Sequence, residues 1–257
     1  MFSPFTLTSS KTNTYYSRVI EMTNDPAKSR KPSDFPDGTN AQSRSLPLRF
    51  PLWLRIGFGA CMVIAIAAVL RRAIAMSKSS TNDAPSQLAD LDRWFLSHAV
   101  LTWIHILCAL AFVLILPFIF RTRPQNSRVL QGAFFFFGLC TGLTAYGMSR
   151  FAVGGWIERS AVLFFDSFFL FSLAKAWQLS KLPQFCLQQR LWMVRAVAVL
   201  LGIATTRPVM GVFFATQQLS HLAPSQFFGI AFWIGFSINT IAIEIWLRTI
   251  KPEVLHA

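Results

Sequence analysis

Six stretches of mostly hydrophobic residues follow one another along the chain after residue 50, with short polar segments between them. They are Leu52–Leu70, Ala99–Phe120, Val129–Met148, Ser160–Leu179, Leu191–Phe214 and Phe227–Leu247. A helix rises about 1.5 Å per residue, so a stretch of about 19 to 24 residues crosses a hydrocarbon core of about 30 Å. The strands of a membrane barrel would be about half as long, with alternating polar and apolar residues. The pattern therefore predicts an all-α, polytopic membrane helix bundle with about six transmembrane helices.

The first 50 residues have a different pattern. Ser, Thr, Asn, Pro, Lys and Arg dominate this segment, and its apolar residues show no regular period. Such a segment buries too little apolar area to offset the entropy that is lost on ordering. We therefore predict a disordered cytosolic tail over residues 1–50, a transmembrane helix bundle over residues 51–250 and a short C-terminal tail over residues 251–257.

Composition and charge support a membrane location. The chain is 53% hydrophobic and 14% charged, whereas a soluble protein carries about 25% charged residues. Its net charge of +13 does not indicate nucleic-acid binding, because no basic, aromatic-rich soluble domain is present to carry it. More Lys and Arg residues flank the side that holds both chain ends, so the positive-inside rule places both ends in the cytosol. Arg71 and Arg72 go against this assignment. The expected partner is the lipid bilayer.

The tryptophans predict where the two membrane interfaces lie. With six spans, four fall near the cytosolic interface and four near the opposite one, as expected for interfacial aromatic belts. The first group is Trp53, Trp177, Trp192 and Trp246, and the second is Trp94, Trp103, Trp156 and Trp233.

Polar residues inside the predicted spans are the candidates for function. Ionisable groups in a span cost about 2.5–3.5 kcal/mol each on insertion scales, so they tend to face the bundle interior and to pair. His105, Asp166 and Arg207 lie at similar depths below the non-cytosolic ends of their spans. This predicts that Asp166 and Arg207 are neighbours in a polar cavity, with His105 close to one of them. A second cluster of Arg195, Lys175 and Glu244 is predicted nearer the cytosolic side.

These residues suggest a membrane-embedded enzyme that acts on a lipid-soluble small molecule, for example in a biosynthetic pathway. His105 would transfer a proton, Asp166 would orient or charge the imidazole, and Arg207 would hold an oxyanion or carboxylate. Buried ion pairs also serve only to lock helix packing. The alternative function is therefore a non-catalytic carrier or a helical subunit of a membrane complex.

No cofactor or metal is predicted from the histidines or cysteines. Haem ligation by two imidazoles needs histidines on two facing helices, but His98 and His105 belong to one stretch, while His221 and His256 lie outside the predicted spans. Haem-based electron transfer is therefore disfavoured. The four cysteines form no C-x-x-C motif and are interpreted as small buried hydrophobic residues.

Several of these positions resemble a family of predicted membrane proteins that is catalogued as domain-of-unknown-function family 2306. The similar positions are His105-Ile106, the block Gln189-Arg190-Leu191-Trp192-Met193-Val194-Arg195, then Arg207, Trp233, Asn239 and Glu244. The resemblance covers roughly residues 92–248 and is most specific around Arg190–Met193. It implies a multi-span fold, but it implies no activity.

The chain departs from that family pattern at two positions. The family tends to have His-Arg before the third span, where this chain has Ser127-Arg128, and it tends to have His where this chain has Gln189. If those histidines bind metal or haem in relatives, the departures imply that this chain has lost that capacity.

Overall fold

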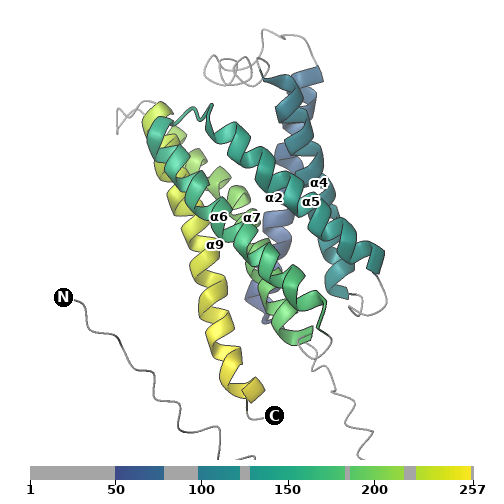
Figure 1. Cartoon of the computed structure of the whole chain (residues 1–257). Coiled ribbons are helices and arrows are strands. Elements are labelled where there is room, and N and C mark those ends of the chain that lie inside the picture. The colour runs from purple at the N-terminus through teal and green to yellow at the C-terminus, as the bar shows by residue number, and fades with distance from the viewer. Residues whose placement is uncertain (1–49, 78–97, 122–127, 183–185, 217–223, 256–257) are drawn as a thin grey trace, which may run out of the picture. The chain divides into compact units, whose positions relative to one another are not determined.

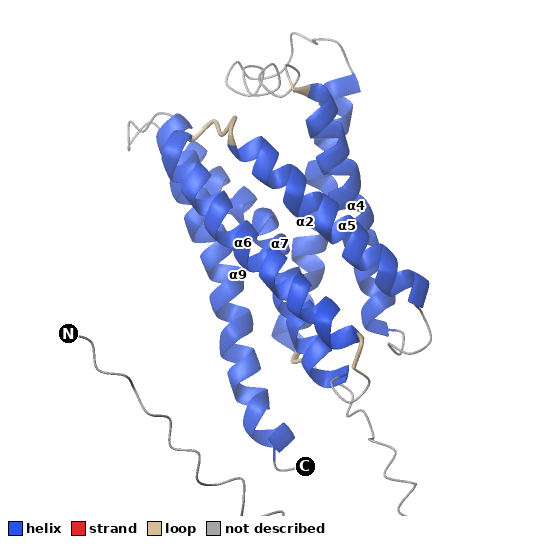
Figure 2. Ribbon diagram, viewed as in Figure 1, coloured by secondary structure: helices blue, strands red, loops and turns tan. Residues whose placement is uncertain are grey.

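The structure is a computed structural model that describes residues 50–77, 98–121, 128–182, 186–216 and 224–255. All regular secondary structure in these ranges is helical (Figure 2). The helices are α2 (Leu52–Ser77), α4 (Ala99–Arg121), α5 (Arg128–Ser149), α6 (Gly155–Ser180), α7 (Cys186–Ala215) and α9 (Pro224–Leu255). The predicted N-terminal tail lies almost entirely outside the described residues.

Six helices are long and apolar enough to cross a membrane, which confirms the predicted fold class and the multi-pass membrane location. Most boundaries agree with the hydrophobic stretches to within a few residues. The largest differences are that α2 continues to Ser77, α6 begins at Gly155 rather than Ser160, α7 begins at Cys186 rather than Leu191, and α9 continues to Leu255. The early start of α6 matters below, because it brings Glu158 into the first turn of a helix.

Five helices form a ring, and the sixth packs on its outside. The main helix contacts join α2 to α4, α4 to α5, α5 to α6, α6 to α7, and α7 back to α2. The last helix, α9, which is yellow in Figure 1, packs against α6 and α7. This arrangement leaves the interior of the ring available for inward-facing side chains.

The α7–α9 contact depends on two glycines. A Cβ atom added to Gly235 would lie 2.7 Å from the backbone nitrogen of Thr206, and one added to Gly202 would lie 2.9 Å from the Cα atom of Phe236. Both distances are too short for a real side chain, so the two backbones approach closely because these residues are glycine. Small residues at a helix contact are the expected solution in a membrane, where packing rather than the hydrophobic effect drives helix association.

Polar contacts also link α7 to α9. Arg195 on α7 forms an ion pair with Glu244 on α9, with 2.5 Å between Nε and Oε1. This confirms that part of the predicted cytosolic cluster, whereas Lys175 lies 5.8 Å from the centroid of the Phe171 ring and forms no ion pair with a described residue. Separately, Thr205 donates a hydrogen bond to Asn239 Oδ1 (2.7 Å), joining α7 and α9.

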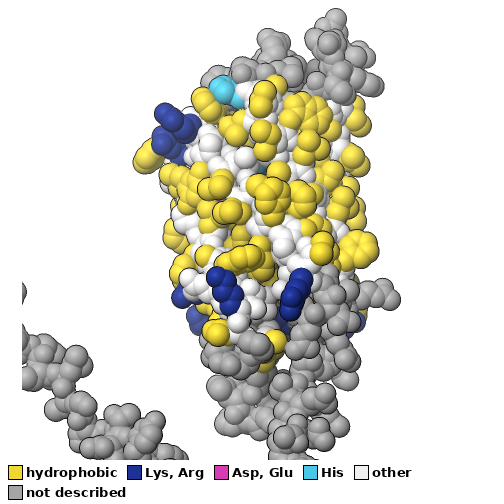
Figure 3. Space-filling view, turned by 45° about the vertical axis from the view of Figure 1, so that its right-hand side comes forward, with side chains coloured by type: hydrophobic (Ala, Val, Ile, Leu, Met, Phe, Trp, Pro, Cys, Tyr) yellow, Lys and Arg dark blue, Asp and Glu magenta, His cyan; other side chains and the backbone are white. Residues whose placement is uncertain are grey.

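The outer surface is that of a protein in lipid. Large apolar side chains such as Ile56, Phe118 and Ile241 are about 60% exposed. On the face in Figure 3, apolar side chains form a broad central area, and basic side chains lie towards its ends. Trp156 is 71% exposed, as an interfacial residue would be. Within the predicted belt, Trp246 is 5% exposed and stacks on Phe50, so its side chain packs against protein rather than lipid.

Candidate functional site

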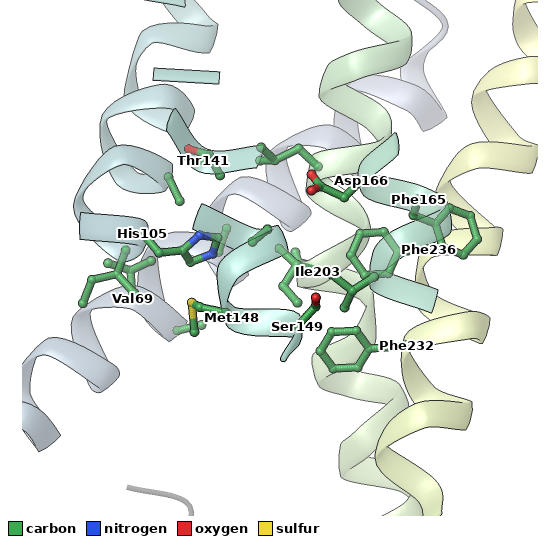
Figure 4. Close-up of a pocket in the computed structure, with 18 of the residues that line it drawn as sticks. Val69, His105, Thr141, Met148, Ser149, Phe165, Asp166, Ile203, Phe232 and Phe236 are labelled. Carbon is green, nitrogen blue, oxygen red and sulfur yellow. The ribbon is translucent and has the colours of Figure 1, made fainter. Parts of the chain in front are cut away.

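A cavity of about 260 Å³ lies within the helix ring and is lined by residues from all six helices. This volume is just below the range of about 300–1,000 Å³ that is usual for small-molecule pockets. The three residues predicted from the sequence, His105, Asp166 and Arg207, all line it. Figure 4 shows the His105 and Asp166 side chains at this cavity, together with Phe232 and Phe236.

Helical periodicity explains why α6 and α7 contribute so much of the wall. On α6, Glu158, Val162 and Asp166 are each four residues apart, so they share one face of the helix. On α7, Val199, Ile203 and Arg207 share a face in the same way. Each face therefore presents polar residues and apolar residues to the same space.

The cavity has two ends with different chemistry. Its loop end is defined here by Arg72, Glu158, Arg207 and the α5–α6 loop residues 151–153, and its core end by Val113, Phe169 and Val199. Eight residues separate Val199 from Arg207, which corresponds to about 12 Å along a helix. The loop end is charged, whereas the core end is apolar. His105 and Asp166 lie between the two ends.

A hydrogen bond with Thr144 holds the imidazole of His105 in place. Its Nδ1 atom lies 2.9 Å from Oγ1 of Thr144, and that hydroxyl lies 2.7 Å from the backbone oxygen of Cys140. A neutral imidazole has one N–H donor and one lone pair, so it can exchange a proton with a molecule in the cavity.

Asp166 is a half-buried acid, and one of its carboxyl oxygens has no hydrogen-bond partner among the described residues. That atom, Oδ2, is itself buried. The Oδ1 atom lies only 3.2 Å from the position that a Cβ atom would take on Gly142, so a side chain at position 142 would crowd the carboxyl group. An unsatisfied buried oxygen is costly in a folded protein, and a donor group of a ligand in the cavity would satisfy it.

Asp166 and Arg207, which were predicted to be neighbours, line the same cavity but form no ion pair in the described part of the chain. Among the described parts of the chain, Arg207 has no hydrogen bond or ion pair with another residue. The acidic group that acts on it electrostatically is Glu158, while the nearby charge of Arg71 opposes it. The depths of residues below the ends of the hydrophobic stretches did not identify Glu158 as the acid near Arg207, because α6 begins five residues earlier than predicted.

Glu158 is the site residue that the sequence interpretation missed. Its Oε2 atom accepts a hydrogen bond from the backbone N–H of Gly154, at 2.5 Å. An acidic residue is favoured in the first turn of a helix, where the backbone N–H groups are unsatisfied. The signal in the sequence was therefore an acid that follows Gly154 and Gly155 just before the hydrophobic stretch.

No protein-family profile, curated protein or solved structure matches the chain. The resemblance to family 2306 therefore stays a prediction. In the described ranges, no three His, Cys, Asp or Glu residues are grouped to hold a metal ion, while His221 and His256 lie outside those ranges.

Proposed function

We propose that this protein is a membrane-embedded enzyme that acts on a lipid-soluble small molecule, with His105, Asp166 and Arg207 as its site residues. The observation that supports this most is that an imidazole, a carboxyl group and a guanidinium from three helices border one cavity within the bundle. Such groups act on a bound molecule more strongly where protein replaces part of the surrounding water. A biosynthetic role and membership of family 2306 are parts of the same proposal.

Each residue has a distinct role in this proposal. His105 transfers a proton to or from the substrate through its imidazole, which a hydrogen bond with Thr144 holds in place. Asp166 accepts a hydrogen bond from the substrate and orients it, since its Oδ2 atom has no protein partner among the described residues. Arg207 binds a carboxylate or a developing oxyanion. The absence of a direct His105–Asp166 hydrogen bond changes the earlier hypothesis, in which Asp166 oriented the imidazole itself.

A metabolite comparison tests the enzymatic role. Cells in which the gene is deleted would be complemented with the wild-type chain, with His105→Ala or with His98→Ala, and their lipid extracts compared by mass spectrometry. We expect a lipid-soluble compound to accumulate in the deletion and with His105→Ala, but not with the wild type or with His98→Ala. His98 is the control because it lies just before the same helix and does not line the cavity. Full complementation by stable His105→Ala protein would contradict the proposal.

The alternative function, a carrier or a helical subunit of a larger complex, has one observation in its favour. No hydrogen bond joins the imidazole to the acid, and both instead border the cavity separately, as in a binding site that performs no chemistry. Purified protein in liposomes distinguishes the two functions. An enzyme changes the mass of its substrate, whereas a carrier moves the compound across the bilayer with its mass unchanged.

A further inference from the structure

The loop end of the cavity is lined by charged side chains. Arg72 and Arg207 line it, and the charge of Arg71 also acts on Arg207. Among the described residues that line this end, the carboxyl group is that of Glu158, and one of its oxygens accepts the Gly154 N–H. Glu158 forms no ion pair with Arg207.

Arg207 in particular forms no ion pair within the described part of the chain, although the charge of Glu158 acts on it. It is exposed and borders the cavity. A charged group within a membrane span is expensive unless it is paired or reaches water. A guanidinium group also suits carboxylate and phosphate oxygens especially well, because it donates two parallel hydrogen bonds to them.

The core end of the same cavity can accept only an apolar group. Val113, Phe169 and Val199 line it, and Phe169 and Val199 are almost fully buried. From Glu158 to Phe169 the wall follows α6 for eleven residues, or about 16 Å. A ligand that fills this space therefore has a charged end and an extended apolar end.

From these features we infer that the ligand of the cavity is an amphiphile with a single anionic head group, a carboxylate or a phosphate, which Arg207 binds, and an apolar tail that points towards Phe169. This inference rests on the proposed function and adds to it the chemical class of the substrate. The tail passes Asp166, which accepts a hydrogen bond from a hydroxyl group where the ligand has one. An anion fits better than a cation because the guanidinium group of Arg207 forms no ion pair with a described residue and donates readily to anionic oxygens.

A binding experiment with simple probes tests this inference. The full chain would be captured in lipid nanodiscs, and binding of radiolabelled dodecanoate and dodecanol measured, with empty nanodiscs correcting for partition into lipid. The extended chains of both probes are similar in length to the cavity wall. Dodecyl phosphate, free phosphate and acetate would serve as unlabelled competitors. The variants would be Arg207→Gln, Arg207→Lys and Arg150→Gln. The last is the control because Arg150 is exposed near the same end of the bundle and does not line the cavity.

We expect saturable binding of dodecanoate that dodecyl phosphate displaces and that free phosphate and acetate do not. Arg207→Gln should weaken dodecanoate binding by about ten- to a hundredfold, which corresponds to the loss of a charge-assisted pair. Arg207→Lys should recover part of this loss. Dodecanol should bind at least tenfold more weakly than dodecanoate, and Arg207→Gln should leave its binding unchanged. Arg150→Gln should change dodecanoate binding by less than twofold.

The other outcomes distinguish a failure of the anionic-ligand inference from a failure of the proposed function. If dodecanol and dodecanoate bind equally well and Arg207→Gln changes neither affinity, the ligand does not need an anionic head group, but the cavity still binds a small molecule. Arg207 would then contact only bilayer phosphates. Displacement by free phosphate as strong as by dodecyl phosphate would overturn the role of the tail. A lack of saturable binding for every probe would overturn both the inference and the proposed function.

Discussion

Breaking the Arg195–Glu244 ion pair should destabilise the bundle, and the size of the loss follows from the burial of the two side chains. Arg195 is 11% exposed and Glu244 is 29% exposed, so the pair lies between a surface pair, worth about 0–1 kcal/mol, and a fully buried one, whose disruption costs about 3–5 kcal/mol. The guanidinium group also makes a second hydrogen bond to Glu244 Oε2 at 3.3 Å. We expect Arg195→Gln and Glu244→Gln each to lower the free energy of unfolding by about 2–3 kcal/mol.

The double variant decides whether the pair itself causes the loss. Removing both charges leaves no uncompensated ion, so the double variant should lose about 1.5 kcal/mol less than the sum of the two single losses, near the upper limit of about 1.7 kcal/mol measured for polar pairs in membranes. Unfolding in mixed micelles with increasing SDS gives these free energies. Lys175→Gln is the matched control, because Lys175 lacks an ion pair with a described residue, and it should cost under about 1 kcal/mol. Additive single losses would refute the reasoning.

Three further predictions follow from the packing, the site and the topology. Gly235→Ala should lower the free energy of unfolding by about 1–3 kcal/mol, because its Cβ atom would collide with Thr206. The control is Gly211→Ala, whose Cβ atom meets nothing within 4 Å and which should stabilise the helix by about 0.5–1 kcal/mol. Equal effects of the two substitutions in the same SDS titration would contradict the close α7–α9 contact. Asp166→Asn should leave the free energy of unfolding unchanged or raise it by about 1 kcal/mol in that titration, because Asp166 Oδ2 has no described hydrogen-bond partner to lose. A decrease of more than about 2 kcal/mol would contradict the unpaired state of this carboxyl group. Protease added to the cytosolic side of sealed vesicles should cut tags at both chain ends, because an even number of spans places both ends on the same side. Protection of only one of the two tags would contradict six spans.

The number and type of helices could be predicted from the sequence because membrane spans are recognised by length and hydropathy alone. Each hydrophobic stretch has to satisfy its backbone groups internally in lipid, which leaves helix as the only local solution for these lengths. The same argument says little about what a given side chain faces. Trp246 had the position of an interfacial residue in the sequence, yet it is buried against Phe50, because its direction around the helix axis is fixed by tertiary packing.

The candidate site could be predicted only in part for the same reason. Depth along the spans identified His105, Asp166 and Arg207, and all three line one cavity. Depth could not give the pairing, which depends on where each helix begins and how it is rotated. Glu158 stood outside the predicted span, and Thr144 looked like an ordinary small residue of a transmembrane helix. Its hydrogen bond with His105 depends on the packing of α4 against α5, which hydropathy does not encode.

Native mass spectrometry of the protein released from its own membrane tests most directly whether the cavity holds a small molecule. The comparison needs two isoleucine substitutions of equal bulk: Ile203→Trp, which narrows the cavity, and Ile238→Trp, on the exposed face of α9. Both variants would first be shown to retain the melting temperature of the wild type to within a few degrees. We expect the wild type and Ile238→Trp to carry the same small-molecule mass, and Ile203→Trp to lack it. Identical spectra for all three proteins, with or without a bound mass, would contradict the assignment of this cavity as the functional site.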